Sequence, residues 1–176
     1  KTRAYSLGLG MIYVNLDGRE PAGIVSAEDA PGLIKEIATN LMAATDPANG
    51  AKVIEQVHII DELHKGEFRD REGDLIPGFA PTYRVSWGTT MGDIKLKKGD
   101  GDAWVSAPVI EANNMNWSGG HVSVALPRVT GTFFSSRPVI LPTEGAHLLD
   151  IAPTVLSLVG VDVPEEMDHA PLKFKD

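Results

Sequence analysis

The sequence contains no cysteine and no long apolar run. Without cysteine it can form no disulfide and offers no thiolate to a metal, so histidine, aspartate and glutamate are the side chains left to bind one. No apolar stretch reaches the roughly 18 residues that cross a bilayer, and we therefore expect no membrane span. Basic residues are also scarce, with 16 lysines and arginines against 24 aspartates and glutamates. The net charge of −8 argues against a protein that coats nucleic acid.

Length and composition are those of a folded domain. The chain has 176 residues, of which 43% are hydrophobic and 23% are charged, values close to the globular average. Residues 1–176 therefore fit a single domain. The opening residues 1–5 include neither an initiator methionine nor the start of a signal peptide, which favours the alternative of a segment of something longer.

Short stretches rich in β-branched and aromatic residues predict strands. The predicted strands cover residues 11–16, 53–60, 75–76, 83–87 and 131–134. Helical stretches separate several of them, and this interleaving indicates an α/β fold. The part near residues 20–70 is expected to be an α+β excursion, a candidate subdomain.

Two stretches have the signals of amphipathic helices. Ser26 and Asp29 form a capping signature, and apolar residues follow at three- and four-residue intervals over residues 33–42. A second helix is predicted from Asp150, its N-cap, to Gly160, where it ends.

The strongest candidate site is residues 113–121, Asn-Asn-Met-Asn-Trp-Ser-Gly-Gly-His. Glycine beside His121 lets the backbone approach a ligand closely and leaves the imidazole exposed, as a metal or phosphate site requires. The alternative is a glycine turn with a surface histidine, because zinc takes three or four ligands and one histidine does not supply them.

The other four histidines are weaker candidates. We expect His58 to be a packed or edge residue in a strand and His64 to be solvated in a charged loop. His147 is expected to be neutral and packed near the last helix, where a positive charge would oppose the helix dipole. His169 lies in the tail. The sequence has no Gly-x-Ser-x-Gly, Walker or His-Glu-x-x-His motif, so no catalytic residue is assigned.

A series of short blocks extends along nearly the whole chain. The blocks are residues 4–10 (AYSLGLG), 12–21 (IYVNLDGREP) with 23–25 (GIV), 74–75 (DL), 83–87 (YRVSW), 117–121 (WSGGH), 131–138 (GTFFSSRP), 150–156 (DIAPTVL) and 163–168 (VPEEMD). Together they resemble the C-terminal portion of type I phosphodiesterase/nucleotide pyrophosphatase proteins, in the alkaline phosphatase superfamily. Each block alone is weak, and the combined match is specific.

The resemblance implies the C-terminal part of an alkaline-phosphatase-like three-layer α/β/α fold. It also implies a divalent-metal site, usually with two zinc ions, that cleaves phosphate esters. In that family a threonine or serine near the N-terminus attacks phosphorus. One metal lowers the pKa of this nucleophile while the other stabilises the leaving oxygen, and a covalent phospho-enzyme then passes to water.

One functional residue of the family maps onto this chain. His121 matches the late histidine that the family uses as a metal ligand. The family commonly has aspartate before that histidine, where this chain has Gly120, and glycine after Met-Asp, where it has His169. No segment matches the nucleophile block or the Ser-Asp-His-Gly block for the second metal, which in the family both precede the Ala-Tyr-Ser motif.

The expected function is therefore a segment of a metal-dependent phosphodiesterase that acts on a small phosphate ester. We expect this segment to contact the N-terminal part of the intact protein and to be inactive by itself. Two alternatives stay open: a phosphotransferase of the cofactor-independent phosphoglycerate mutase branch, and a non-catalytic ligand-binding or regulatory module. Substrate-binding residues are not assigned, because Arg84 fits an anion site or a structural ion pair, and Trp87 and Trp117 fit base stacking or packing.

Overall fold

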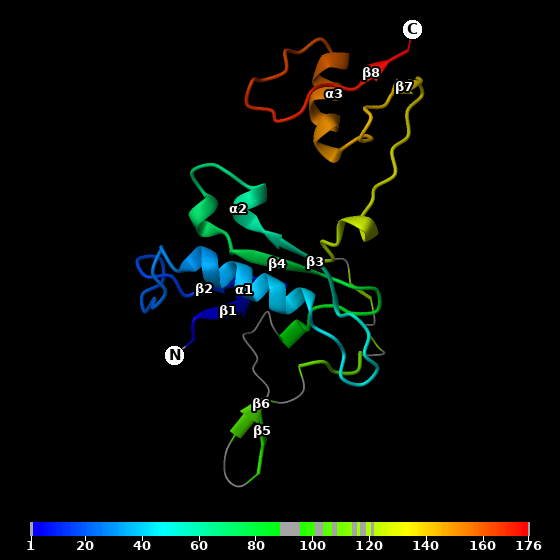
Figure 1. Cartoon of the computed structure of the whole chain (residues 1–176). Coiled ribbons are helices and arrows are strands. Elements are labelled where there is room, and N and C mark those ends of the chain that lie inside the picture. The colour runs from blue at the N-terminus through cyan, green and yellow to red at the C-terminus, as the bar shows by residue number, and fades with distance from the viewer. Residues whose placement is uncertain are drawn as a thin grey trace. The chain divides into compact units, whose positions relative to one another are not determined.

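The computed structural model describes residues 2–88, 96–100, 104–106, 109–113, 116, 119–120 and 122–175. These residues form a mixed α/β structure with small antiparallel sheets and three α-helices, which agrees with the α/β class expected from the sequence. The chain divides into two compact units, Lys1–Val129 and Thr130–Asp176. Figure 1 shows the elements of both units.

The first unit is built on a four-stranded sheet with the strand order β1-β2-β4-β3. Its strands are β1 (Ala4–Leu7), β2 (Met11–Val14), β3 (Ile54–Ile59) and β4 (Leu75–Phe79). All three pairings are antiparallel. β1 and β2 form a hairpin whose turn includes Gly8 and Gly10, both at positive φ. Three of the predicted strands are thereby confirmed, and the last of them extends further than its two predicted residues.

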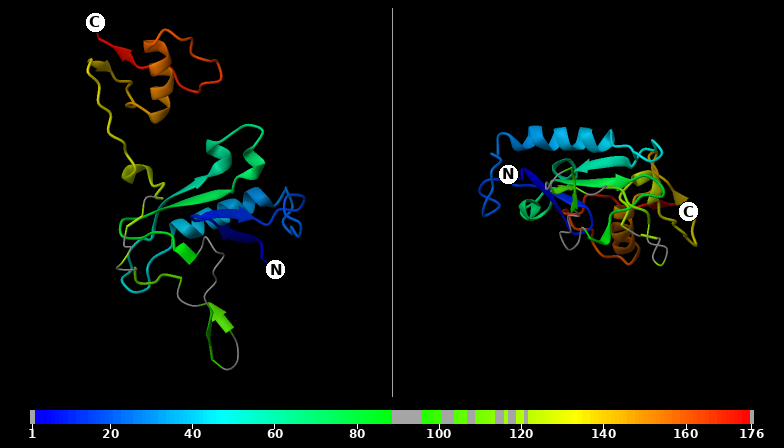
Figure 2. Two further views of the ribbon diagram at one scale, coloured as in Figure 1. Left: turned by 180° about the vertical axis from the view of Figure 1, so that it is seen from behind. Right: turned by 90° about the horizontal axis from the view of Figure 1, so that it is seen from below.

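The helix α1 (Ala30–Met42) covers one face of this sheet, as the right-hand view of Figure 2 shows. Its buried residues Leu33 and Ile34 pack with Val14 of β2 and Leu75 of β4. These side chains come from the apolar stripe that the sequence predicted, and burying them excludes water between helix and sheet.

The predicted capping signature forms a turn before α1 rather than its cap. The backbone N–H of Asp29 donates to Ser26 Oγ at 3.1 Å, and the Ser26 hydroxyl donates to Asp29 Oδ2 at 2.7 Å. Asp29 is the N-cap residue, without a side-chain bond into the helix. The helix therefore begins at Ala30, after the turn that Ser26 closes.

Smaller elements complete the described part of the first unit. They are α2 (Ile60–Leu63), the 3₁₀ helices η1 (Arg69–Arg71) and η3 (Leu126–Arg128), and the antiparallel strands β5 (Leu96–Lys98) and β6 (Trp104–Ser106).

The second unit contains one α-helix and a short two-stranded sheet. Its elements are β7 (Val139–Ile140), the 3₁₀ helix η4 (Leu148–Asp150), α3 (Ile151–Leu158) and β8 (Lys173–Phe174). β7 and β8 pair antiparallel. The predicted second helix is confirmed: Asp150 is the N-cap of α3, and Gly160, with φ +74°, lies just beyond its end.

Two predicted strands are wrong. Residues 83–87 and 131–134 have strand-like composition but form no ladder with any other described residue. Tyr83 instead donates its hydroxyl to Asp46 Oδ2 at 2.8 Å, and Phe134 is 87% exposed. β-propensity describes the fit of a side chain to a sheet surface, so it predicts no strand where no neighbouring strand is present.

A buried ion pair ties the turn after β2 to the start of β4. Arg19 Nη1 donates to Asp74 Oδ1 at 3.0 Å and Nη2 donates to Oδ2 at 2.8 Å, a bidentate geometry that fixes both side chains. The two side chains are only 19% and 9% exposed. Asp74 Oδ2 also accepts the Val14 N–H at 2.6 Å, and Arg19 Nη2 donates to the Val14 carbonyl at 2.7 Å. The hydrogen bonds with Asp74 raise the pKa of Arg19.

Glu20 extends this cluster toward β1. Its Oε1 accepts from Arg19 Nε at 2.9 Å and from the Tyr5 hydroxyl at 3.1 Å, while Oε2 accepts the Leu16 N–H at 2.7 Å. Burial, together with the hydrogen bond to Glu20, raises the pKa of Tyr5. β1, the turn after β2 and the start of β4 therefore share one hydrogen-bonded network.

The turn that carries Arg19 closes tightly on itself. Gly23 donates its N–H to the Glu20 carbonyl at 3.0 Å, and a Cβ atom at position 23 would collide with the Leu16 carbonyl oxygen. Only glycine fits this close approach of two backbone segments.

Within the described part of the chain, every helix is too short or too polar to cross a membrane. This agrees with the expectation of no membrane span in these residues.

We predict that Arg19→Ala lowers the free energy of unfolding of the first unit by up to about 3–5 kcal/mol, because it removes the bidentate partner of the buried Asp74 carboxylate. Arg69, whose Nη2 lies 4.0 Å from Asp74 Oδ1, stays as a more distant cation. Arg19→Lys is expected to lose less, since it keeps the charge but not the bidentate geometry. Urea unfolding followed by tryptophan fluorescence measures this, because all three tryptophans lie in the first unit.

Arg3→Ala is the matched control. Arg3 lies 3.7 Å from Glu36, and both side chains are more than half exposed, so its loss should cost less than about 1 kcal/mol. Equal destabilisation by Arg19→Ala and Arg3→Ala would contradict the assignment of Arg19 as the stabilising partner.

Candidate functional site

The segment that follows the predicted site is held against the sheet. His58 Nε2 in β3 lies 2.7 Å from the Val124 carbonyl oxygen, and Gln56 Oε1 accepts the Leu126 N–H at 3.1 Å. A Cβ atom at Gly78 in β4 would lie 2.8 Å from the Ala125 backbone. Glycine in β4 and two polar side chains of β3 therefore position residues 124–126, a few residues after the Gly-Gly-His block.

Gly120 lies beside Arg84. A Cβ atom at position 120 would meet Arg84 Cδ at 3.5 Å, an ordinary van der Waals contact. The Arg84 guanidinium donates to Asn113 Oδ1 from both Nε and Nη2, at 3.1 and 2.9 Å, and to the Val85 carbonyl from Nη1 at 3.3 Å. Position 120 thus has room for a side chain, and Arg84 has a structural role in joining two loops.

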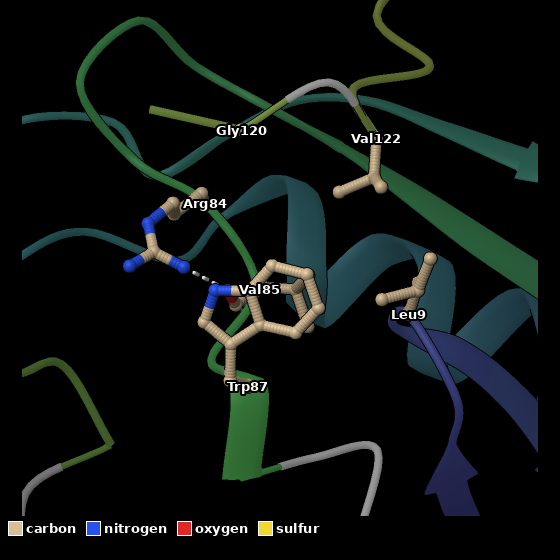
Figure 3. Close-up of a pocket in the computed structure, with 6 residues that line it drawn as sticks. All are labelled: Leu9, Arg84, Val85, Trp87, Gly120 and Val122. Atoms are coloured by element: carbon tan, nitrogen blue, oxygen red, sulfur yellow. Dashed lines mark hydrogen bonds between the residues drawn. The ribbon is translucent and has the colours of Figure 1, made fainter. Parts of the chain in front are cut away.

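A small hollow adjoins these residues. Figure 3 shows the residues that line it, which are Leu9, Arg84, Val85, Trp87, Gly120 and Val122. Its volume is about 10 Å³, roughly the space that one water molecule requires. It is therefore too small to hold a phosphate ester by itself.

His121, Trp117 and Ser118 lie outside the described residues. The prediction that His121 is a metal ligand therefore stays a prediction. Within the described residues, no three histidine, aspartate or glutamate side chains converge in an arrangement that would hold a metal ion. The donors that can be placed do not fit a complete two-metal centre.

Two of the other histidines lie as the sequence predicted. His58 is 9% exposed and bonded to the Val124 carbonyl, so it is a packed strand residue. His64 is exposed, with its Nδ1 2.8 Å from Glu72 Oε2. Neither histidine contributes to a candidate site.

The remaining two histidines meet around Asp150 in the second unit. His169 Nδ1 lies 2.7 Å from Asp150 Oδ1, and the His147 N–H donates to Asp150 Oδ2 at 2.6 Å. The ring centroids of His147 and His169 are 4.9 Å apart. The carboxylate is buried, with 6% of Asp150 exposed. The hydrogen bond from the His147 backbone and, next, that from His169 lower the pKa of Asp150.

The hydrogen bonds fix which ring nitrogens carry protons. An ionised carboxylate only accepts hydrogen bonds, so His169 Nδ1 must carry the proton of its bond to Asp150. His147 Nδ1 accepts the Leu149 N–H at 3.2 Å and is therefore unprotonated. His147 acts as a cap of η4, not as the packed residue that the sequence predicted.

Further bonds anchor the tail to the first turn of α3. The Thr154 hydroxyl donates to the Asp150 carbonyl at 2.5 Å and accepts the Leu172 N–H at 2.8 Å. With the Asp150–His169 pair, these bonds hold residues 169–172 against the start of the helix. Asp150 thus connects η4, α3 and the tail.

Sequence reasoning missed this cluster. The spacing of His147 and Asp150 is that of a capping box, which the structure forms, so that spacing was a signal for their contact. The pairing of His169 with Asp150 spans 19 residues, and no local pattern indicates it.

Comparison of this chain with protein-family models, curated proteins and solved structures found no match.

We predict that the anchoring of the tail is lost in acid. The lowered pKa of Asp150 means that its ionised form stabilises the folded unit. This stabilisation is complete above the pKa of an unfolded aspartate, about 4, and is lost as the pH falls through the lower folded-state pKa. Amide hydrogen exchange at Leu172, measured from about pH 6 to about pH 2 and corrected for the intrinsic rate, should lose its protection.

Asp150→Asn should remove this pH dependence, whereas Asp162→Asn, at an exposed position, should retain it. If Asp150→Asn kept the acid transition of the original protein, the transition would belong to another group.

Proposed function

We propose that this chain is the C-terminal portion of a metal-dependent phosphodiesterase of the nucleotide pyrophosphatase type. In this proposal the intact protein has an alkaline-phosphatase-like three-layer α/β/α fold and binds two divalent ions, zinc by preference. His121 is the one metal ligand that this portion contributes. The substrate is a small phosphate ester, and the portion contacts the N-terminal part of the protein.

The observation that carries the proposal is that blocks of the family pattern, far apart in sequence, meet in space. Tyr5 of the first block bonds to Glu20 of the second, and Arg19 of the second pairs with Asp74 of the third. The proposal requires these blocks to belong to one folded domain, and their contacts meet that requirement.

The later blocks give a similar, weaker indication. Asp150 begins the DIAPTVL block, and His169 directly follows the VPEEMD block. The side chains of these two residues are in hydrogen-bond contact, with His169 Nδ1 2.7 Å from Asp150 Oδ1. At this position the chain has histidine where the family usually has glycine, and the pair gives that histidine a role in joining the two blocks.

The departure at Gly120 is compatible with the same proposal. The 3.5 Å contact between a Cβ atom at position 120 and Arg84 Cδ leaves space for the aspartate that the family commonly has there. Either residue therefore fits at position 120, because no neighbouring atom is close enough to require glycine there.

The described residues do not supply a set of donors for two metal ions, so no chemical step is derived from them. In the proposal, the nucleophile and most ligands belong to the part that carries the Thr or Ser block and the Ser-Asp-His-Gly block. Bound zinc would supply Lewis-acid activation of the phosphate ester.

We predict that the intact protein hydrolyses bis(4-nitrophenyl) phosphate with zinc and that the 176-residue chain alone does not. In the intact protein, His121→Ala should lower kcat/KM by at least about 100-fold, because a metal ligand is lost. Release of nitrophenolate, followed by absorbance, measures this.

The matched control is His64→Ala, which removes an exposed histidine paired with Glu72 and should leave activity near that of the original protein. Turnover by the 176-residue chain that required zinc and disappeared in His121→Ala would overturn the prediction that this portion is inactive by itself. Equal activity of the intact protein and its His121→Ala variant would overturn the role of His121.

One observation favours a second candidate function. Gly120 removes the carboxylate that would accompany His121, which is what a non-catalytic ligand-binding or regulatory module of the same fold would tolerate. The upstream coding sequence separates the two candidates. A nucleophile block with Ser-Asp-His-Gly supports the enzyme, and the absence of both supports the module.

A further inference from the structure

An open groove lies in the first unit between the start of α1 and the segment of residues 61–70. Both elements can be followed in Figure 1. The groove has a volume of about 830 Å³, within the range of roughly 300–1,000 Å³ that is usual for small-molecule sites. The turn that carries Arg19 forms part of its wall. This size suits a small organic molecule.

The floor of the groove is apolar. It is lined by Leu16, Ala27, Ala30, Pro31, Ile34 and Ile59. Ile34 belongs to the core that joins α1 to the sheet, and Leu16, Ala30 and Ile59 pack against that core. A ligand with an apolar body therefore meets a surface that folding has already formed.

The charged side chains of the groove fall into two groups. Arg19 and Asp74 neutralise each other through the bidentate pair. Arg69 forms an ion pair with Asp61, with Nε 2.8 Å from Oδ1, and a longer one with Asp74, with Nη2 4.0 Å from Oδ1. The charges of these four side chains are thereby compensated within the groove.

The other group is strongly acidic. Asp17, Glu62, Glu67 and Asp70 are exposed and make no ion pair with any residue that the structure describes, and Lys35 is the one cation that accompanies them. Four carboxylates against one ammonium leave a net negative potential over an apolar floor. They come from the turn after β2, from α2 and from the segment around η1, so they border the groove on more than one side.

We propose that this groove binds an organic ammonium ion with an apolar body. The apolar body lies on the floor, where burial removes its surface from water. The ammonium group lies among the carboxylates, whose oxygens accept the hydrogen bonds that it donates and whose negative charge attracts it. An anionic ligand of the same shape is repelled by the same carboxylates. This inference goes beyond the proposed phosphodiesterase function and does not depend on it.

The test uses two fluorescent probes with the same apolar group and opposite charge. Dansylcadaverine carries an alkylammonium group, and dansylglycine carries a carboxylate. We expect saturable binding of dansylcadaverine to the full 176-residue chain, with a rise and blue shift of dansyl emission. Dansylglycine should bind at least about tenfold more weakly, because its carboxylate is repelled by the groove carboxylates that attract the ammonium group of dansylcadaverine. Equal binding of the two probes, or no saturable binding of dansylcadaverine, overturns the proposal.

The charge variant is the triple substitution Asp17→Asn, Glu62→Gln and Glu67→Gln. It should weaken dansylcadaverine binding at least about tenfold. The matched control removes three exposed acidic charges from the second unit, Asp162→Asn, Glu165→Gln and Glu166→Gln. An equal loss in both triple variants would assign the effect to net charge alone and overturn the proposal.

A steric variant tests the floor independently. Ala27 is exposed and lines the groove, so Ala27→Trp should occupy it without disturbing the core and should abolish binding. Ala22→Trp places the same side chain at an exposed position outside the groove lining and should leave binding unchanged. Circular dichroism verifies that each variant is folded. Unaltered binding in a folded Ala27→Trp variant overturns the proposed location.

Discussion

The bidentate pair of Arg19 and Asp74 is the constraint on which the rest of the first unit depends. A buried charge that loses its closest partner costs several kcal/mol, and in this pair the bidentate contact is the closest that Asp74 makes with a cation. Asp74 directly precedes β4, and Arg19 lies in the turn after β2, and both also bond to Val14 at the end of β2. The pair thereby fixes the pairing of β4 with β2. It also supplies a rigid, electrically neutral wall to the groove, which leaves the outer carboxylates to determine the groove's potential.

The sequence predicts those parts of the fold in which burial has a local period. The apolar stripe of α1 and the strands at residues 11–16 and 53–60 were predictable because each element buries one face against the next. Residues 83–87 are also rich in β-branched and aromatic residues, but a strand there would need a neighbouring strand, which the described fold does not provide. Residues 131–134 fail for the same reason. Whether a ladder partner exists is a property of the whole chain and is not encoded in the segment.

The candidate sites were less predictable than the fold. The Gly-Gly-His block attracted attention because glycine beside His121 is a local signal, whereas His121 itself lies outside the described residues. The contact of His169 with Asp150 depends on how the tail folds back onto α3, and the spacing of residues in the sequence does not predict this. The resemblance named the blocks that contain Arg19 and Asp74 but not their pairing.

The close approach at Gly23 restricts how this protein can change through mutation. Gly23 and Arg19 lie in one short turn. Gly23 permits the close approach to the Leu16 backbone because it lacks a side chain, and Arg19 bonds to Val14 at the end of β2 and to Asp74 before β4. Both residues bond to Glu20, and substitutions at residues of one hydrogen-bond network are often not additive. A mutation that opens the turn at position 23 also displaces Arg19, so a second loss there costs little more. The two positions are therefore expected to vary together in evolution, with either both residues kept or the whole turn replaced.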